Sequence, residues 1–351
     1  MEFKLLPPPD GVPTRLLGLD LVERARRMLV AAGLTEDTGQ GDLVIYPSEV
    51  TGPAGVGKEI AQTRPPDGGV LALAVGTARP ILVVSASARS NLEPTQRRPL
   101  SAPAMELRPD NVRAVKKFML RCLRKPVDGL ISRSINRPIS LAMSSLFVET
   151  SLTPNQLTAM TFGVALVAAA LMTQGWFFLG ACVMQLSSIL DGCDGEVARL
   201  KYQSSRLGGW LDTILDDVSN QLFLLATAWG VYHATGGVLR TLVVCAAIGA
   251  FLLGGLSLFF VYRRLIQSGN SDAAGLTWGA TPGTSPLRRF LGTYLANVVK
   301  RDFYYFLFLP ITAVGHAELI VFGAFFAAMG AAITIVREST TGQLASSRRT
   351  G

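Results

Sequence analysis

The hydrophobic pattern divides the chain near residue 150, and long apolar segments dominate everything after that point. Polar connections separate six such segments, approximately residues 157–173, 175–195, 207–231, 238–262, 299–315 and 319–336. A helix needs about 20 residues to cross the hydrocarbon core of a bilayer. Several of the segments reach that length, and the fifth is the shortest. The pattern therefore predicts a mainly α, polytopic membrane domain with six transmembrane helices over residues 151–340, followed by a tail at residues 341–351.

The first 105 residues have shorter apolar runs of mixed period. Asp20 followed by Glu23 resembles a capping box for a helix over "LVERARRMLVAA", and Gly33 provides a natural stop after it. The runs "DLVIYP", "GVLALAV" and "PILVVSAS" are typical of short buried strands. These signals predict a small N-terminal α/β segment over residues 1–105.

One motif in this segment imitates a phosphate-binding loop. "GPAGVGKE", from Gly52 to Glu59, matches the P-loop spacing up to Lys58 and then places Glu59 where a Ser or Thr should hold Mg²⁺. A carboxylate there would repel phosphate. We therefore interpret residues 52–59 as a surface loop.

Residues 106–150 form a basic linker between the two parts. The stretch "VRAVKKFMLRCLRKPVDGLISRSINRPISLAMSSLF" mixes Lys and Arg with large apolar residues at helical spacing. Such a helix can lie in the headgroup region of a membrane. An ordinary surface helix of the N-terminal segment is the alternative, and it is disfavoured because membrane spans follow at once.

Charge refines the picture. Only 17% of the residues are charged, against about 25% in soluble proteins, and the net charge is +8. The positive net charge suits a protein that faces anionic lipids or phosphorylated substrates. A soluble nucleotide-binding protein is excluded by the mean hydropathy of +0.36. Nucleic acid is not expected as a partner, because no nucleic-acid module accompanies the charge.

The basic residues also predict an orientation. They gather in the connections between spans two and three and between spans four and five, and in the tail, whereas the opposite connections carry only Arg240. The start of the chain has no apolar core of signal-peptide length. By the positive-inside rule we expect both termini and the basic connections on the cytosolic side of the cytoplasmic membrane.

Carboxylates interrupt the second and third spans. Asp191 and Asp194 are three residues apart, and Asp212 and Asp216 are four apart, so each pair shares a helix face. The short turn "LKYQSSRLGG" brings the two faces together. Four converging carboxylates repel unless a divalent cation neutralises them, and oxygen ligands select Mg²⁺, Mn²⁺ or Ca²⁺. Acids at the membrane interface explain one or two of these residues but not four.

The residues around the acids complete a motif. The pattern Asp191-x-x-Asp194-Gly195-x-x-Ala198-Arg199, then eight residues, then Gly208-x-x-x-Asp212-x-x-x-Asp216 resembles the signature of the CDP-alcohol phosphotransferase family, and the resemblance extends over residues 126–337. It implies a membrane enzyme that transfers a substituted phosphate group from a CDP-alcohol to an alcohol and releases CMP. It also implies a homodimer.

The resemblance assigns roles to individual residues. Two Mg²⁺ or Mn²⁺ ions would be held by Asp191, Asp194, Asp212 and Asp216, with Asp216 also the general base. The CDP moiety would be contacted by Gly195, Arg199, Ser205, Gly208 and, at the start of span one in "TPNQLT", Pro154 and Asn155. For Asn155 a role as a helix cap is an open alternative.

Donor and acceptor are less defined. Lys300 and Arg301 in "KRDF" could bind a phosphorylated polar acceptor such as inositol phosphate, and an anchor at the cytosolic interface is the alternative for Lys300. Four motifs, "KPVDGLISRSINRPIS", "TPNQLT", "LDGCDGE" and "KRDF", follow a nucleotidyltransferase-like segment. Within the family this combination most resembles di-myo-inositol phosphate phosphate synthase and its bifunctional relatives. The resemblance implies a soluble domain that makes CDP-inositol.

The N-terminal segment departs from that pattern. Its stretch "TRLLGLDLVERARRMLVAAGL" resembles the beginning of a sugar-phosphate nucleotidyltransferase, just past the Gly-rich nucleotide loop. Here "PPPDGVPTRL" takes the place of that loop, and prolines lack the N–H donors that such a loop needs. We interpret the segment as degenerate. CDP-diacylglycerol is therefore the alternative donor, and a cation transporter that uses the acids is the alternative of a different class. A chain that begins near residue 106 is expected to keep transferase activity.

Overall fold

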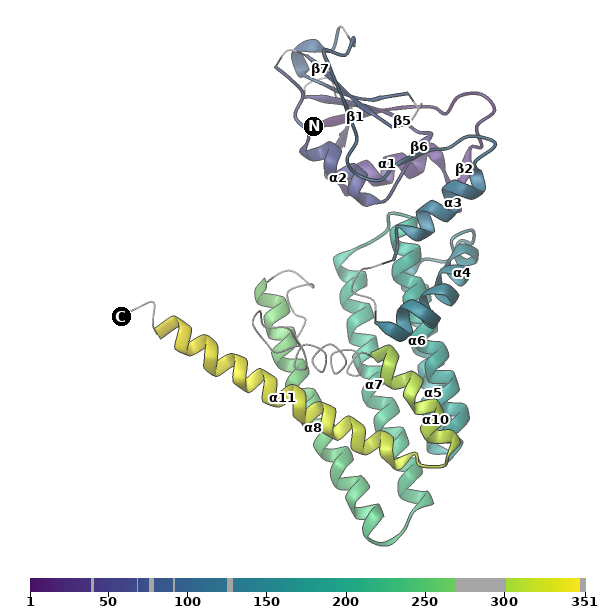
Figure 1. Ribbon diagram of the computed structural model, residues 1–351, viewed down its shortest axis with the longest axis vertical. Helices are drawn as coiled ribbons and strands as arrows, with labels where there is room; N and C mark the ends of the chain where they lie inside the picture. The colour runs from purple at the N-terminus through teal and green to yellow at the C-terminus, as the bar shows by residue number, and fades with distance from the viewer. Residues whose placement is uncertain are drawn as a thin grey trace, which may run out of the picture. The chain divides into compact units, whose positions relative to one another are not determined.

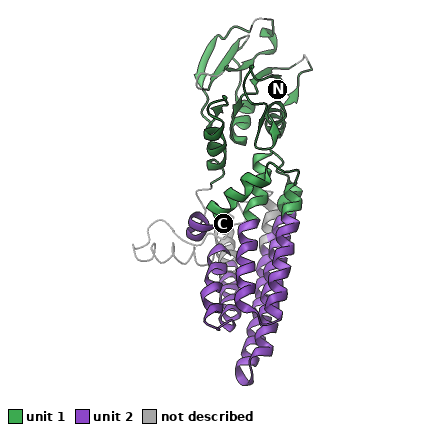
Figure 2. Cartoon of the chain, turned by 90° about the vertical axis from the view of Figure 1, so that its right-hand side faces the viewer, with its two compact units in different colours: residues 1–128, 137–157, 191–210 green, residues 129–136, 158–190, 211–351 purple. Residues whose placement is uncertain are grey.

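The computed structural model describes residues 1–38, 41–67, 69–75, 79–90, 92–124, 129–268 and 301–347. They form two compact units, which Figure 2 colours separately. Unit 1 consists of Met1–Asp128, Arg137–Leu157 and Asp191–Trp210. Unit 2 consists of Gly129–Asn136, Thr158–Leu190 and Leu211–Gly351.

A six-stranded mixed sheet forms the centre of the N-terminal part of unit 1. Its strand order is β4-β1-β5-β8-β7-β9, with the bounds β4 Thr35–Glu36, β1 Glu2–Leu6, β5 Leu43–Pro47, β8 Ile81–Val84, β7 Val70–Ala74 and β9 Gln96–Pro99. The pairs β1–β4, β1–β5 and β7–β9 are parallel, and β8 runs antiparallel to both of its neighbours. The predicted strands correspond to β5, β7 and β8, so the N-terminal α/β interpretation is confirmed.

Helices α1 (Leu21–Ala31) and α2 (Ala54–Gln62) pack against this sheet through one apolar core (Figure 1). The Asp20 side chain caps α1 by accepting hydrogen bonds from the N–H groups of Val22 (2.9 Å) and Glu23 (3.4 Å). The Glu23 carboxylate pairs instead with Arg27 on the next turn, so only one half of the capping box forms. Gly33 ends the helix with φ +86°, a conformation that glycine adopts without strain.

The interpretation of residues 52–59 as a surface loop is wrong, because α2 begins at Ala54. Glu59, the residue that spoils the P-loop motif, lies in this helix. Its carboxylate accepts hydrogen bonds from the N–H groups of Ser101 (2.9 Å) and Ala102 (2.6 Å). Burial raises the pKa of Glu59, but these two hydrogen bonds, together with the Ser101 side chain and the charge of Arg98, hold the pKa below its ordinary value.

The basic linker contains two helices. Helix α3 spans Val112–Arg121, and α4 spans Arg137–Phe147 after a π-helical turn at Ser132–Asn136. Val115 and Met119 of α3 are buried in a second core of unit 1, together with Leu16, Leu17, Leu21, Leu107, Leu123, Leu141, Val148 and Leu200. Protein therefore covers the apolar face of α3, and a position of the linker in the headgroup region stays a prediction.

In the described part of the chain after residue 150, six helices lie at the predicted places: α5 Pro154–Thr173, α6 Phe177–Leu200, α7 Arg206–Ala234, α8 Gly237–Ser268, the shorter α10 Arg301–Ala313 and α11 Glu318–Ser347. By length and composition, two described segments can cross a membrane, α5 and residues 237–260 of α8. Large apolar side chains are exposed on several of the six helices, such as Phe178 on α6, Leu252 on α8 and Phe326 on α11. An extended apolar exterior of this kind is typical of a membrane protein.

Close helix packing depends on a glycine in α7. A Cβ atom at Gly230 would lie 2.1 Å from the carbonyl oxygen of Met172 at the end of α5. No side chain fits at this distance. Small residues at crossing points are a common means by which membrane helices approach one another.

Candidate active site

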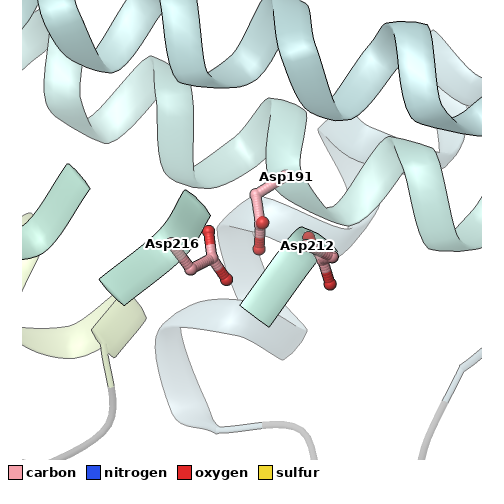
Figure 3. Close-up of side chains that lie close together, drawn as sticks. All are labelled: Asp191, Asp212 and Asp216. Atoms are coloured by element: carbon pink, nitrogen blue, oxygen red, sulfur yellow. The ribbon is translucent and has the colours of Figure 1, made fainter. Parts of the chain in front are cut away.

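Three carboxylates from two helices lie together (Figure 3). Asp191 comes from α6, and Asp212 and Asp216 come from successive turns of α7. One oxygen atom from each of them lies within 4.8 Å of the others, and all three residues are partly buried. At that separation two carboxylates repel by on the order of 3 kcal/mol in a medium of effective dielectric constant about 20. An all-oxygen set in this arrangement fits a hard divalent cation such as Mg²⁺ or Mn²⁺.

Asp194 is placed differently. Among the described residues it is not part of this cluster, and its carboxylate accepts a hydrogen bond from the adjacent N–H of Gly195. Its side chain is buried, with 6% exposed. The structure thus brings together three of the four predicted ligands, and the role of Asp194 stays a prediction.

Helix α10 contacts the acid face of α7. The guanidinium of Arg301 forms an ion pair with the carboxylate of Asp216. One turn further along both helices, the hydroxyl of Tyr305 donates to the side-chain oxygen of Asn220. The predicted acceptor residue and the predicted base are therefore neighbours, whereas Lys300 lies outside the described residues.

A second group of predicted residues meets where α5 and α7 begin. The Ser205 hydroxyl accepts a hydrogen bond from the N–H of Gly208 at 2.9 Å, so it caps α7. A Cβ atom at Gly208 would lie 3.0 Å from Ser205 Oγ and 3.1 Å from Asn155 Oδ1. These three residues are thus adjacent, and glycine leaves the space between the two polar side chains open.

The start of α5 clarifies the position of Asn155. Pro154 is the first residue of the helix, where its missing N–H costs nothing. The cap is formed by Thr153 and Gln156: Thr153 Oγ1 accepts from the N–H of Gln156 (3.3 Å), and Gln156 Oε1 accepts from the N–H of Thr153 (2.9 Å). The alternative of Asn155 as the helix cap is therefore wrong.

Arg199, the residue predicted to bind the diphosphate, lies beside Gly195. A Cβ atom at Gly195 would lie 3.2 Å from Nη1 of Arg199. Glycine at this position therefore lets the guanidinium lie close against the backbone of α6, one turn beyond the acids.

Sequence reasoning assigned no role to Glu196, which the structure makes prominent. It is fully buried and forms an ion pair with Arg137 Nη1 at 2.6 Å. Its two carboxylate oxygens also accept hydrogen bonds from the hydroxyls of Ser140 (2.9 Å) and Ser144 (2.7 Å). The three partners lie on one face of α4, so Glu196 fastens that helix to α6 beside the acid motif. The helical spacing of Arg137, Ser140 and Ser144 is the one sequence signal that points to a shared partner.

Asp217 is the other acid without a predicted role. Its carboxylate accepts a hydrogen bond from the hydroxyl of Tyr262 in α8. Although it directly follows Asp216, it does not belong to the carboxylate cluster. It therefore provides a natural comparison for Asp216.

Comparison with known proteins gives a consistent result. A model of the family described as CDP-alcohol phosphatidyltransferase matches residues 151–336, just over half of the chain. The bifunctional IPC transferase and DIPP synthase of Aquifex aeolicus is 40% identical over 121 residues, which are 34% of this chain and 28% of that protein. The protein of the same name from Thermococcus kodakarensis is 41% identical over 126 residues, 36% of this chain and 29% of that protein.

Shorter relatives and a solved structure are also similar. The phosphatidylinositol phosphate synthase of Corynebacterium glutamicum is 28% identical over 121 residues, 33% of this chain and 55% of that protein. The crystal structure of Mycobacterium tuberculosis phosphatidylinositol phosphate synthase in apo form has a TM-score of 0.37 and 23% identity, and the match covers 58% of this chain and 94% of that one. The chain spans less than a third of the length of the two bifunctional relatives.

Proposed function

From the premise that this chain belongs to the CDP-alcohol phosphatidyltransferase family, we propose that it transfers a substituted phosphate group from a CDP-alcohol to the hydroxyl of an acceptor alcohol and releases CMP. The observation that carries the proposal is the cluster of Asp191, Asp212 and Asp216 inside the matched region. A nucleotide diphosphate needs cations, and this cluster offers the oxygen ligands that bind them.

The carboxylates of the motif have two proposed roles, metal binding and proton transfer. Asp191, Asp212 and Asp216, together with Asp194, would hold two Mg²⁺ or Mn²⁺ ions. When bound, such ions offset negative charge on the donor's diphosphate. The carboxylate of Asp216 takes the proton of the acceptor hydroxyl, because it is the member of the cluster that also faces a predicted acceptor residue, Arg301.

The donor is held by residues of the same motif. Arg199 offers a planar fork for the diphosphate next to the backbone of Gly195. The adjacent residues Asn155, Ser205 and Gly208, with Pro154 fixing the start of α5, form the nucleotide side of the site.

The acceptor is a polar alcohol that carries phosphate, such as inositol phosphate. Two observations support this class: the guanidinium of Arg301 beside Asp216, and the names of relatives such as phosphatidylinositol phosphate synthase. Lys300 would assist by its charge. A CDP-diacylglycerol donor, which would make the protein a phospholipid synthase, is the alternative to CDP-inositol.

The membrane arrangement follows from the charges and helices. We propose that all six helices, α5 to α8 with α10 and α11, cross the cytoplasmic membrane as residues 151–340, with both termini and the site on the cytosolic side. Residues 1–105 form a degenerate nucleotidyltransferase-like domain, residues 106–150 an interfacial linker and residues 341–351 a tail. The functional assembly is a homodimer.

The test is product analysis with purified protein in lipid nanodiscs. CDP-inositol and CDP-diacylglycerol are each supplied with inositol phosphate, with Mg²⁺ or with EDTA, and the products are identified by mass spectrometry. We expect Mg²⁺-dependent CMP release with one donor and no release by Asp191→Asn. Cation flux in proteoliposomes without CMP release from any CDP-alcohol would establish the transporter alternative and refute the proposal.

A further inference from the structure

The connection between α6 and α7 joins the two helices that carry the acid motif. Helix α6 ends at Leu200 and α7 begins at Arg206, so five residues separate them. A connection this short fixes how the two helices are offset along their length. The offset in turn decides whether Asp191 on α6 meets Asp212 and Asp216 on α7.

A buried arginine of the N-terminal domain caps the end of α6. Arg24 of α1 is only 3% exposed. Its Nη1 donates to the carbonyl of Leu200 at 2.9 Å, and its Nη2 donates to the carbonyls of Leu16 at 2.9 Å and Leu17 at 3.3 Å. The last carbonyls of a helix lack partners within the helix. A side chain distant in sequence therefore satisfies the final carbonyl of the acid-bearing helix.

Tyr202, in the connection itself, is held by the same domain. Its hydroxyl donates to the carbonyl of Gly52, and the Arg24 guanidinium lies over its ring, 5.6 Å from the centroid. Its φ of +52° falls in the left-handed region, which is unfavourable for a residue of this type. The surrounding contacts hold the strained turn in place.

Two further contacts hold the α6–α7 turn, and we call all of these contacts together the seat of the turn. The ammonium of Lys201 donates to the carbonyls of Thr150 (2.8 Å) and Leu152 (2.9 Å). The side chain of Leu200 is 1% exposed and belongs to the core formed with Leu16, Leu17 and Leu21. All of these groups lie within unit 1, which also contains the end of α6.

We propose that the degenerate N-terminal domain is a positioning device for the catalytic centre: through Arg24 and Tyr202 it sets the α6–α7 turn and thereby the spacing of the metal-binding acids. Arg24 and Tyr202 are positioning residues, since neither touches the reacting groups. The expectation that a chain beginning near residue 106 keeps its activity is revised accordingly. Such a chain would lose Arg24 and Gly52 and, with them, the seat of the turn.

The experiment compares full-length variants in nanodiscs. Tyr202→Phe removes one hydroxyl and keeps the ring, and Arg24→Met removes the cap. Arg24→Lys is the conservative variant, because an ammonium can donate to the same carbonyls. Arg26→Met, at an exposed position of α1, and Tyr232→Phe, whose ring lies against Arg240, are the matched controls. Mn²⁺ affinity is measured by electron paramagnetic resonance, and amide exchange of residues 201–209 by mass spectrometry.

One buried hydrogen bond corresponds to about a fivefold change in an equilibrium constant. We expect Tyr202→Phe to weaken Mn²⁺ binding by up to about that factor and to speed amide exchange in the turn. Arg24→Met should have a larger effect on both, Arg24→Lys should restore most of the loss, and the controls should match the wild type. If Arg24→Met does not fold, the Mn²⁺ affinity and amide exchange of Tyr202→Phe alone test the proposal.

The outcomes separate this inference from the proposed function, on which it rests only for the role of the acids. If folded Tyr202→Phe binds Mn²⁺ like the wild type, the inference is overturned, whatever the change in melting temperature. If the wild type binds no Mn²⁺, the proposed metal site is refuted. Faster amide exchange of residues 201–209 in Tyr202→Phe would then still support the role of the N-terminal domain in holding the turn. Unchanged amide exchange would overturn that role.

Discussion

Replacing Asp216 by asparagine separates catalysis by this residue from binding by the cluster. The substitution keeps the size of the side chain and one potential metal oxygen, but it removes the charge and the basicity. Loss of a general base typically slows a reaction by about 10²–10⁴, which corresponds to about 3–5 kcal/mol of activation free energy. We therefore expect Asp216→Asn to lose nearly all turnover while it retains Mg²⁺-dependent binding of the CDP-alcohol.

The structure bounds the effect of this substitution on stability. Asp216→Asn breaks the ion pair with Arg301, whose partners are 25% and 29% exposed. Ion pairs with this much exposure to solvent contribute about 0.2–1 kcal/mol. Removing the charge of Asp216 also relieves its repulsion with Asp191 and Asp212, which acts in the opposite direction. In a chain of this size, we therefore expect a fall in melting temperature of no more than about 4 °C. A large loss of turnover with a small change in Tm therefore indicates chemistry and not unfolding.

The assay measures donor affinity with and without Mg²⁺, turnover and Tm for three variants. Asp191→Asn should lose Mg²⁺-dependent donor binding as well as turnover, because its carboxylate faces both acids of α7. Asp217→Asn is the matched control: it makes the same change one residue away, and its amide oxygen can still accept the hydroxyl of Tyr262. Wild-type turnover by Asp216→Asn would show that the base lies elsewhere.

Three further outcomes are expected. Arg301→Ala should raise the KM of the acceptor much more than that of the donor in steady-state kinetics; equal effects would remove Arg301 from the acceptor site. Glu196→Gln should lower the free energy of unfolding by about 3–5 kcal/mol, because it leaves the guanidinium of Arg137 without its buried counter-charge, and thermal unfolding measures this. Gly18→Ala should also destabilise the fold, since the added Cβ would lie 1.9 Å from the Val148 carbonyl oxygen and φ there is +72°; an unchanged Tm would contradict that close approach.

The sequence predicted the elements that depend on local pattern. The helices α5 to α8, α10 and α11 follow from apolar segments, and β5, β7 and β8 follow from short apolar runs between turn residues. The cap of α1 at Asp20 and its end at Gly33 follow from side-chain chemistry within a few residues. The family was predicted from a motif whose spacing is itself local, and the family match confirms it.

Features that depend on distant partners were not predictable. Residues 52–59 resemble a loop in composition, but Glu59 is fixed in a helix by backbone groups 42 and 43 residues away. Helical spacing places Asp194 on the face of Asp191, yet it does not fix the side-chain torsions, and the carboxylate turns to the N–H of Gly195. Likewise, nothing near Tyr202 in the sequence indicates that its hydroxyl binds a carbonyl 150 residues earlier.

The two contacts between α10 and α7 have a consequence for protein engineering. Arg301 forms an ion pair with Asp216, and four residues further along each helix Tyr305 donates a hydrogen bond to Asn220. Both helices therefore run in the same direction, and their register is locked at two points. Among the positions between these anchors, 304 is part of the packing, because the ring of Tyr304 contacts the rings of Tyr305 and Phe308. Positions 302 and 303 are therefore the ones to vary in a library. With Arg301 as the proposed acceptor residue, we expect variants with a changed acceptor preference to arise there without a shift of the helix.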